Sequence, residues 1–144
     1  MSPTGKTPDV RAERNEPQRV GAEQLDALIQ AAKRAGHVVI PLDLRSCADK
    51  ATLLTIASAA FDFPHWFGHN WDAFFDCLVD LASARRATGC VIILRNAAAM
   101  REHAPEALDT ALGILEDAAK VWERRGVAMR TFIDVAVPDA HAQP

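Results

Sequence analysis

Three aspartates recur at four-residue intervals in the segment HNWDAFFDCLVD, residues 69–80. They are Asp72, Asp76 and Asp80, and in a helix they lie in one row on one face. Like charges at this spacing cost an isolated helix about 0.2–0.5 kcal/mol per pair. Residues 61–84 contain four aspartates and no lysine or arginine. A patch of one charge attracts a partner of the opposite charge, so this row favours a surface that binds a basic partner.

A metal site is a second interpretation of the same region. His65 and His69 lie four residues apart and precede Asp72 and Asp76, and two histidines with two carboxylates can hold zinc. However, a proline and a glycine in the segment 63–69 predict a loop. The histidines then share no helical face. We therefore favour loop histidines on or under a partner-facing surface, and predict no metal.

Other enzymatic interpretations find little support in the sequence. It contains no Walker-type phosphate loop, no G-x-G-x-x-G after a strand and no G-x-S-x-G around a serine. A carboxylate pair for acid–base catalysis needs two contrasting environments across a cleft, so that the two pKa values separate. Aspartates on one helix stripe share one environment. The sequence thus predicts a protein that is not an enzyme and needs no cofactor.

The helix that carries the aspartates is expected to begin at Asn70, which can cap it. Asp72 then lies in the first turn, where the helix dipole favours a negative charge. Asp76 is mid-helix and Asp80 lies near the end, where the dipole disfavours acids, so helix stability explains neither. Six apolar residues form the stripe expected to face the core: Trp71, Phe74, Phe75, Leu78, Leu81 and Ala82.

A solvated polar face would explain one or two such aspartates. There are three aspartates in register, with no cation nearby in the sequence and with the aromatic residues Trp66 and Phe67 beside them. For this arrangement a binding surface is at least as good an explanation as a solvated face. Aromatic side chains beside the acids supply the apolar anchor that binding hot spots need.

Helices and strands are expected to alternate along the chain. They are helix 22–35, strand 37–44, helix 49–60, the aspartate helix, strand 90–94, helix 105–125 and strand 127–135. This order predicts an α/β domain with a small three-stranded, mostly parallel sheet packed with helices, plus an extra N-terminal helix. Pro41 cannot donate a ladder hydrogen bond, so its strand is expected at a sheet edge or with a bulge.

One domain is expected to account for most of the 144 residues. Residues 1–20 hold three prolines and scattered charge, which predicts a disordered tail. The domain is then 21–137, with the extra helix at 21–36, and residues 138–144 form a frayed C-terminal tail.

The overall composition narrows the class of partner and the compartment. A net charge of −3 argues against direct nucleic-acid binding. No run approaches the roughly 20 apolar residues of a membrane span, and the N-terminus has no apolar run typical of a secretory signal. Three cysteines, an odd number in no metal-ligand spacing, are typical of reduced thiols. We predict a cytoplasmic protein.

One segment resembles the signature of the barstar family, the intracellular inhibitors of barnase-type ribonucleases: FPHWFGHNWDAFFDCL, residues 63–78. The matching positions are Pro64, Trp66, Phe67, Gly68, Asn70, Asp72, Ala73, Asp76, Cys77 and Leu78. Fainter similarity extends over roughly the last hundred residues. The resemblance implies a parallel sheet covered by helices, and a binding face made of the loop and helix at 64–76.

The resemblance also implies roles for individual residues. Asp76 matches the aspartate that enters the nuclease active site, where cations normally hold the RNA phosphate. Asp72 matches the one that contacts basic groups beside it. Trp66 and Phe67 match aromatic residues that pack over the active-site rim.

Two further residues, Gly68 and Asn70, match residues that shape the family's loop. This sequence also departs from the family pattern. His69 replaces an acid of better-known members, and Asp80 is an additional acid. The family's acidic residue on the later helix has no secure match, although Asp117 is a candidate.

We therefore expect an intracellular, immunity-type inhibitor that blocks a barnase-like ribonuclease with its acidic helix and aromatic loop. An alternative is an interaction module that binds a different basic partner through the same face. A third, a metal-dependent hydrolase that uses His65, His69 and Asp72, requires stoichiometric zinc. The sequence leaves the oligomeric state open.

Overall fold

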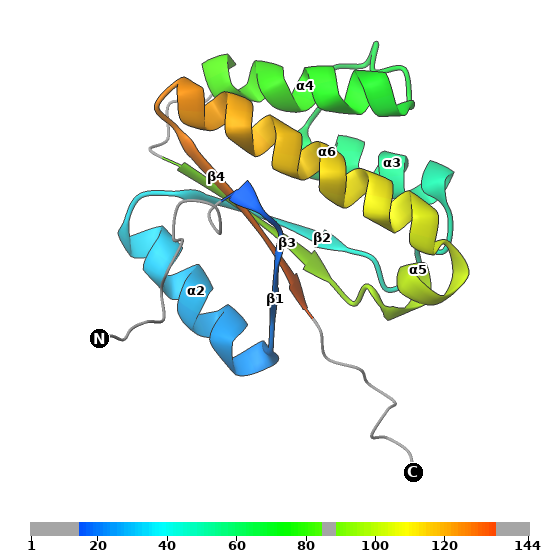
Figure 1. Ribbon diagram of the computed structural model, residues 1–144, viewed down its shortest axis with the longest axis horizontal. Helices are drawn as coiled ribbons and strands as arrows, with labels where there is room; N and C mark the ends of the chain where they lie inside the picture. The colour runs from blue at the N-terminus through cyan, green and yellow to red at the C-terminus, as the bar shows by residue number, and fades with distance from the viewer. Residues whose placement is uncertain (1–14, 85–88, 135–144) are drawn as a thin grey trace.

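The computed structural model describes residues 15–84 and 89–134 (Figure 1). In these residues one sheet contains four parallel strands in the order β1-β4-β3-β2. The strands are β1 (Gln18–Val20), β2 (Val38–Asp43), β3 (Gly89–Arg95) and β4 (Ala128–Asp134). The helices are α2 (Ala22–Arg34), α3 (Lys50–Phe61), α4 (Trp71–Ala84), α5 (Ala98–His103) and α6 (Pro105–Arg124).

The predicted α/β class with a parallel sheet is confirmed, but the predicted number of strands was wrong. A fourth strand, β1, pairs with β4 so that Gln18 lies opposite Phe132. It falls inside the range 1–20 that was expected to be a disordered tail. Strand β1 has three residues and one buried apolar side chain, Val20, so its sequence shows no alternation of apolar and polar residues. Its pairing with β4 is what makes it a strand. Residues 1–14 and 138–144 lie outside the described residues.

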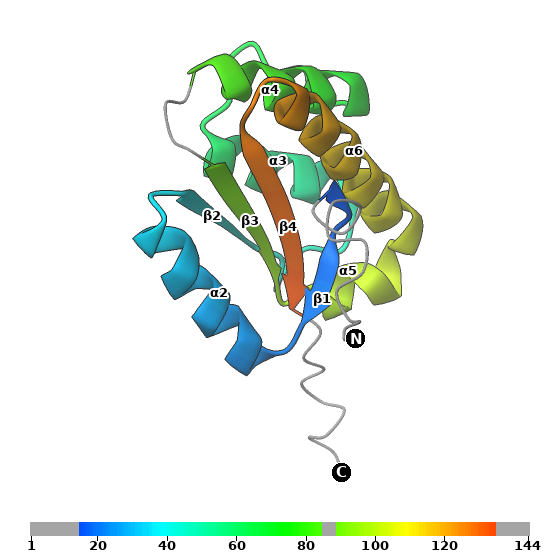
Figure 2. The same ribbon diagram turned by 60° about the vertical axis from the view of Figure 1, so that its left-hand side comes forward.

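Helices cover both faces of the sheet. Helices α3, α5 and α6 lie on one face, with α4 packed on α6, and α2 lies on the other face (Figures 1 and 2). Because both faces are covered, β3 is buried along almost its whole length. The extra N-terminal helix packs Leu25 and Ala32 into a separate small core with residues of β1, β3 and β4.

One local feature of this fold confirms an expectation, and a second shows how α3 begins. Strand β2 is an edge strand, and its Pro41 is exposed and needs no ladder bond of its own. Asp49 caps α3, because its Oδ1 accepts a hydrogen bond from the Thr52 N–H at 2.8 Å.

Among the described residues, none of the helices has the length and apolar character needed to cross a membrane.

Candidate functional site

The start of the acidic helix α4 is fixed by Asn70. The Asn70 Oδ1 accepts a hydrogen bond from the Ala73 N–H at 2.8 Å, and the Asn70 Nδ2 donates to the Gly68 carbonyl oxygen at 3.3 Å. This confirms the predicted cap. Asp72 consequently lies in the first turn of α4, where the positive end of the helix dipole stabilises its negative charge.

The loop before α4 is tightly folded. A Cβ atom at Gly68 would lie 3.0 Å from the Asn70 Nδ2, so a larger residue there would push the capping amide aside by a few tenths of an ångström. The next residue, His69, has a left-handed backbone with φ of 54°. Its ring lies against the Phe67 ring, with centroids 4.7 Å apart. These contacts hold the exposed His69 beside the first turn of α4.

The two aromatic residues expected to contact a partner lie in different environments. Trp66 is 62% exposed, whereas Phe67 is 5% exposed and packs against Phe63 with ring centroids 5.0 Å apart. The expectation that both form a contact surface therefore needs correction for Phe67. Because the loop turns its side chain into the core, Phe67 supports the loop and Trp66 alone presents a large apolar surface.

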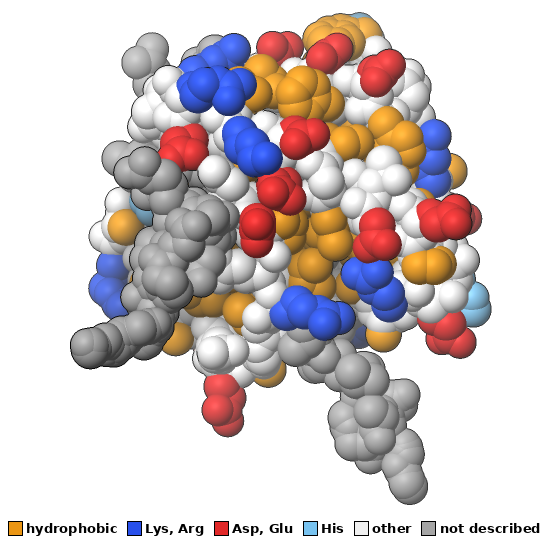
Figure 3. Space-filling model, in the orientation of Figure 1, with side chains coloured by type: hydrophobic (Ala, Val, Ile, Leu, Met, Phe, Trp, Pro, Cys, Tyr) orange, Lys and Arg blue, Asp and Glu red, His pale blue; other side chains and the backbone are white. Residues whose placement is uncertain are grey.

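The three aspartates of α4 are all exposed. Among the described residues, ion pairs join Arg101 to Asp109 and Lys120 to Glu116, and none involves the α4 aspartates. Figure 3 shows acidic side chains along α4, with hydrophobic side chains exposed between them and α6. Residues 61–84 contain no lysine or arginine. Within the described fold, no lysine or arginine from another segment forms an ion pair with these aspartates either.

One thiol lies beneath this charged row. Cys77 is buried, and burial raises the pKa of its thiol, with a further increase from the negative charges of Asp80 and Asp76. The Cys77 thiol is therefore kept protonated and less reactive than an exposed cysteine. It contributes packing and no nucleophile to the acidic face.

A shallow groove of about 410 Å³ runs between α4 and α6. It is lined by Trp71, Asp72, Phe75, Asp76, Ile114 and Asp117. We call these six residues the acidic groove. Its carboxylates come from two helices, while its apolar surface comes from three half-buried side chains. Asp80 and Trp66 are not among the residues that line it.

Asp117 is the later-helix acid that the sequence left unassigned. Its neighbours Leu115, Ala118 and Ala119 are buried, so Asp117 lies at the solvent edge of α6. The rotation of α6 is fixed by Trp122, whose indole Nε1 donates to the Leu78 carbonyl oxygen of α4 at 2.9 Å. The alternation of buried and exposed positions could place Asp117 at the surface, but only the packing of α6 on α4 brings it to the groove.

The metal interpretation lacks a ligand set. Within the described residues, no group of three or more His, Cys, Asp or Glu side chains could hold a metal ion. His65 and His69 are both exposed on the loop, and they do not form such a group with Asp72.

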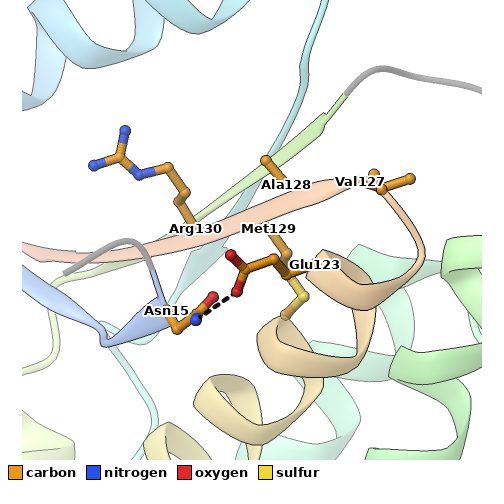
Figure 4. Close-up of a pocket in the computed structure, with 7 residues that line it drawn as sticks. Asn15, Glu123, Val127, Ala128, Met129 and Arg130 are labelled. Carbon is orange, nitrogen blue, oxygen red and sulfur yellow. Dashed lines mark hydrogen bonds between the residues drawn. The ribbon is translucent and has the colours of Figure 1, made fainter. Parts of the chain in front are cut away.

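A second cavity, of about 240 Å³, lies at the turn from α6 into β4. There the Asn15 Nδ2 donates to the Glu123 Oε1 at 2.9 Å, and the Arg130 side chain points away from that pair (Figure 4). The bond attaches the start of the described chain to α6. This cavity shares no lining residue with the acidic groove.

Comparison with known proteins identifies one family. Residues 37–134 match the family model described as Barstar (barnase inhibitor). The match contains the loop, α4, α6 and the acidic groove, and it leaves out β1 and α2. No curated protein matches the chain.

Proposed function

The chain belongs to the barstar family of barnase inhibitors, and we propose that it inhibits a barnase-like ribonuclease by covering the active site, without catalysing a reaction. The observation that carries this proposal is the acidic groove. Asp72, Asp76 and Asp117 line one concave surface, and none of them forms an ion pair among the described residues. A nuclease site that binds RNA phosphates supplies the missing cations.

In the proposed complex, Asp76 is the central contact. It lies in the middle of α4 and lines the groove, so its carboxylate can enter a basic cleft while Asp72 and Asp117 contact cations on either side. The half-buried rings of Trp71 and Phe75 exclude water around these ion pairs. A charge pair is worth more where water is excluded than where it is exposed.

The loop before α4 completes the proposed face. Trp66 is the exposed aromatic anchor, and such side chains dominate many protein interfaces. Gly68 and Asn70 hold the loop on α4, and His69 is exposed beside them. Asp80 lies outside the groove, so we propose that it contributes to the long-range attraction of a basic partner rather than to close contact.

We propose that this inhibition takes place in the cytoplasm, as an immunity-type protection of the cell from the nuclease. In the described part of the chain, Cys47, Cys77 and Cys90 are buried and form no disulfide, which suits a reducing compartment.

Inhibition assays test the proposal. Wild type is titrated into a panel of barnase-type ribonucleases at low and high salt, beside Asp76→Ala and the matched control Asp26→Ala. Asp26 is also an exposed helical aspartate, but it lies on α2, on the other face of the sheet. We expect tight inhibition that weakens with salt, and that Asp76→Ala weakens strongly whereas Asp26→Ala does not.

Two results would count against the proposal. If no nuclease of the panel is inhibited, the partner is of another kind, and a pull-down that returns a basic protein other than a nuclease would support the alternative interaction module. If Asp76→Ala and Asp26→Ala inhibit equally well, the acidic groove is not the inhibitory surface.

A further inference from the structure

A lysine from another helix lies against one of the residues that line the acidic groove. The Lys50 Nζ is 5.2 Å from the centroid of the Trp71 ring, and Trp71 lines the groove. Residues 61–84 themselves contain no lysine or arginine. The fold therefore brings a positive charge from α3 to Trp71, beside the carboxylates of the groove.

The local structure of α3 does not explain this lysine. Lys50 is the first residue of the helix, where the dipole disfavours a cation, and no acid occupies the first turn to offset it. Asp49 is engaged as the cap of Thr52. Lys50 is exposed and forms no ion pair among the described residues. The Lys50 ammonium lies over the aromatic face of Trp71, which is a weak contact at an exposed site.

The position of Lys50 constrains the charge of a partner. A partner surface that is basic throughout would bring its own cations against Lys50, and like charges placed together across an interface disfavour binding. We infer that Lys50 is a specificity-determining residue, which pairs with an acidic side chain of the partner next to the cations that enter the acidic groove. This inference rests on the proposed function and specifies the charge pattern of the partner.

Charge reversal tests the inference. Lys50→Glu is compared with Lys33→Glu, which makes the same change in net charge at an exposed position of α2 on the other face of the sheet. A third variant, Lys50→Met, keeps an unbranched chain over Trp71 without the charge. Binding of each protein to the barnase-type ribonuclease that wild type inhibits most strongly is measured by surface plasmon resonance. A glutamate at the start of α3 suits the helix dipole, so Lys50→Glu is expected to fold, and thermal melting verifies this.

We expect Lys50→Glu to raise the dissociation constant about tenfold over Lys33→Glu, mainly through faster dissociation. Lys50→Met should fall between wild type and Lys50→Glu. Tighter binding by Lys50→Glu would mean that the partner is basic opposite Lys50, and would overturn the inference. Equal binding by Lys50→Glu and Lys33→Glu would overturn it as well. If wild type binds no ribonuclease, both the proposed function and this inference fail. If wild type binds a ribonuclease but Lys50→Glu binds it as Lys33→Glu does, only this inference fails.

Discussion

Trp122 of α6 donates its indole N–H to the backbone carbonyl oxygen of Leu78 in α4, at 2.9 Å and out of contact with solvent. A buried bond of this kind is costly to break, because the carbonyl oxygen would lose its partner. It joins the two helices whose outer sides carry Asp76 and Asp117. The core beneath the groove thus fixes the position of one carboxylate relative to the other.

This relationship predicts a binding role for Asp117. Asp117→Ala should raise the dissociation constant for the inhibited ribonuclease about tenfold, or about 1.4 kcal/mol, because one carboxylate of the groove is lost. Isothermal titration calorimetry measures the change.

Glu116→Ala is the matched control for this substitution. Glu116 precedes Asp117 on the same helix, but it pairs with Lys120 and lies outside the acidic groove. If the two alanine variants bind the nuclease equally, Asp117 has no part in the interface.

Removal of Asp76 should weaken binding but stabilise the free protein. The substitution Asp76→Ala relieves repulsion from Asp72 and Asp80 and introduces a better helix former, which together raise the free energy of unfolding by about 1 kcal/mol. Urea denaturation at low and high salt measures this change. The gain should shrink at high salt, since salt screens the repulsion.

The same substitution should cost about 2–5 kcal/mol of binding free energy or more, because it leaves the partner's cation without its carboxylate where water is excluded. If Asp76→Ala were less stable than wild type, Asp76 would have a stabilising contact in the free protein. That result would contradict the prediction that the substitution stabilises the fold while it weakens binding.

The acidic row of α4 was predictable from the sequence because a helix places every fourth residue on one face. The groove was not. Trp71 and Phe75 fit the apolar stripe and were expected in the core, yet both are half-buried and line the groove. Asp117 comes into place only through the packing of α6 on α4, and Lys50 only because the fold brings the start of α3 to the Trp71 ring. No sequence spacing encodes such contacts between helices.

Two other differences concern the Phe67 side chain and strand β1. Phe67 lies next to Trp66 in a loop, where no periodicity distinguishes a buried from an exposed aromatic residue, and contact with Phe63 decides the matter. Strand β1 depends on pairing with β4, and the paired residues Gln18 and Phe132 are 114 positions apart in the sequence. A three-residue strand with one buried side chain has no pattern of its own.

Trp66 and Phe67 should respond to substitution in opposite ways. Trp66→Ala should leave the free energy of unfolding almost unchanged, because the side chain is 62% exposed, and should weaken nuclease binding through loss of an aromatic anchor. Phe67→Ala opens a cavity in the core and should lower the free energy of unfolding by about 3–5 kcal/mol.

Both variants are compared by urea denaturation and by calorimetric titration at a temperature where each remains folded. Phe67→Leu, which keeps most of the apolar volume, should recover much of the lost stability. If Trp66→Ala bound the nuclease as tightly as wild type, the loop would lie outside the interface.

The cap of α3 predicts how stability depends on pH. The Thr52 N–H bonds to the Asp49 carboxylate and holds the pKa of Asp49 below its ordinary value. The folded state therefore binds the Asp49 proton less readily than the unfolded chain does. The stabilisation by the cap is complete above the unfolded pKa of about 3.9, and it is lost as the pH falls through the lower folded pKa.

Asp49→Ala should accordingly be less stable than wild type at neutral pH, and the difference should narrow as the pH falls below about 4. Asp49→Asn keeps a capping oxygen without the ionisable proton, so its stability relative to Asp49→Ala should not vary over the same range. Urea denaturation of the three proteins between about pH 2.5 and 7 covers this transition. A difference between wild type and Asp49→Ala that stayed constant across the range would show that the capping carboxylate is not what stabilises the start of α3.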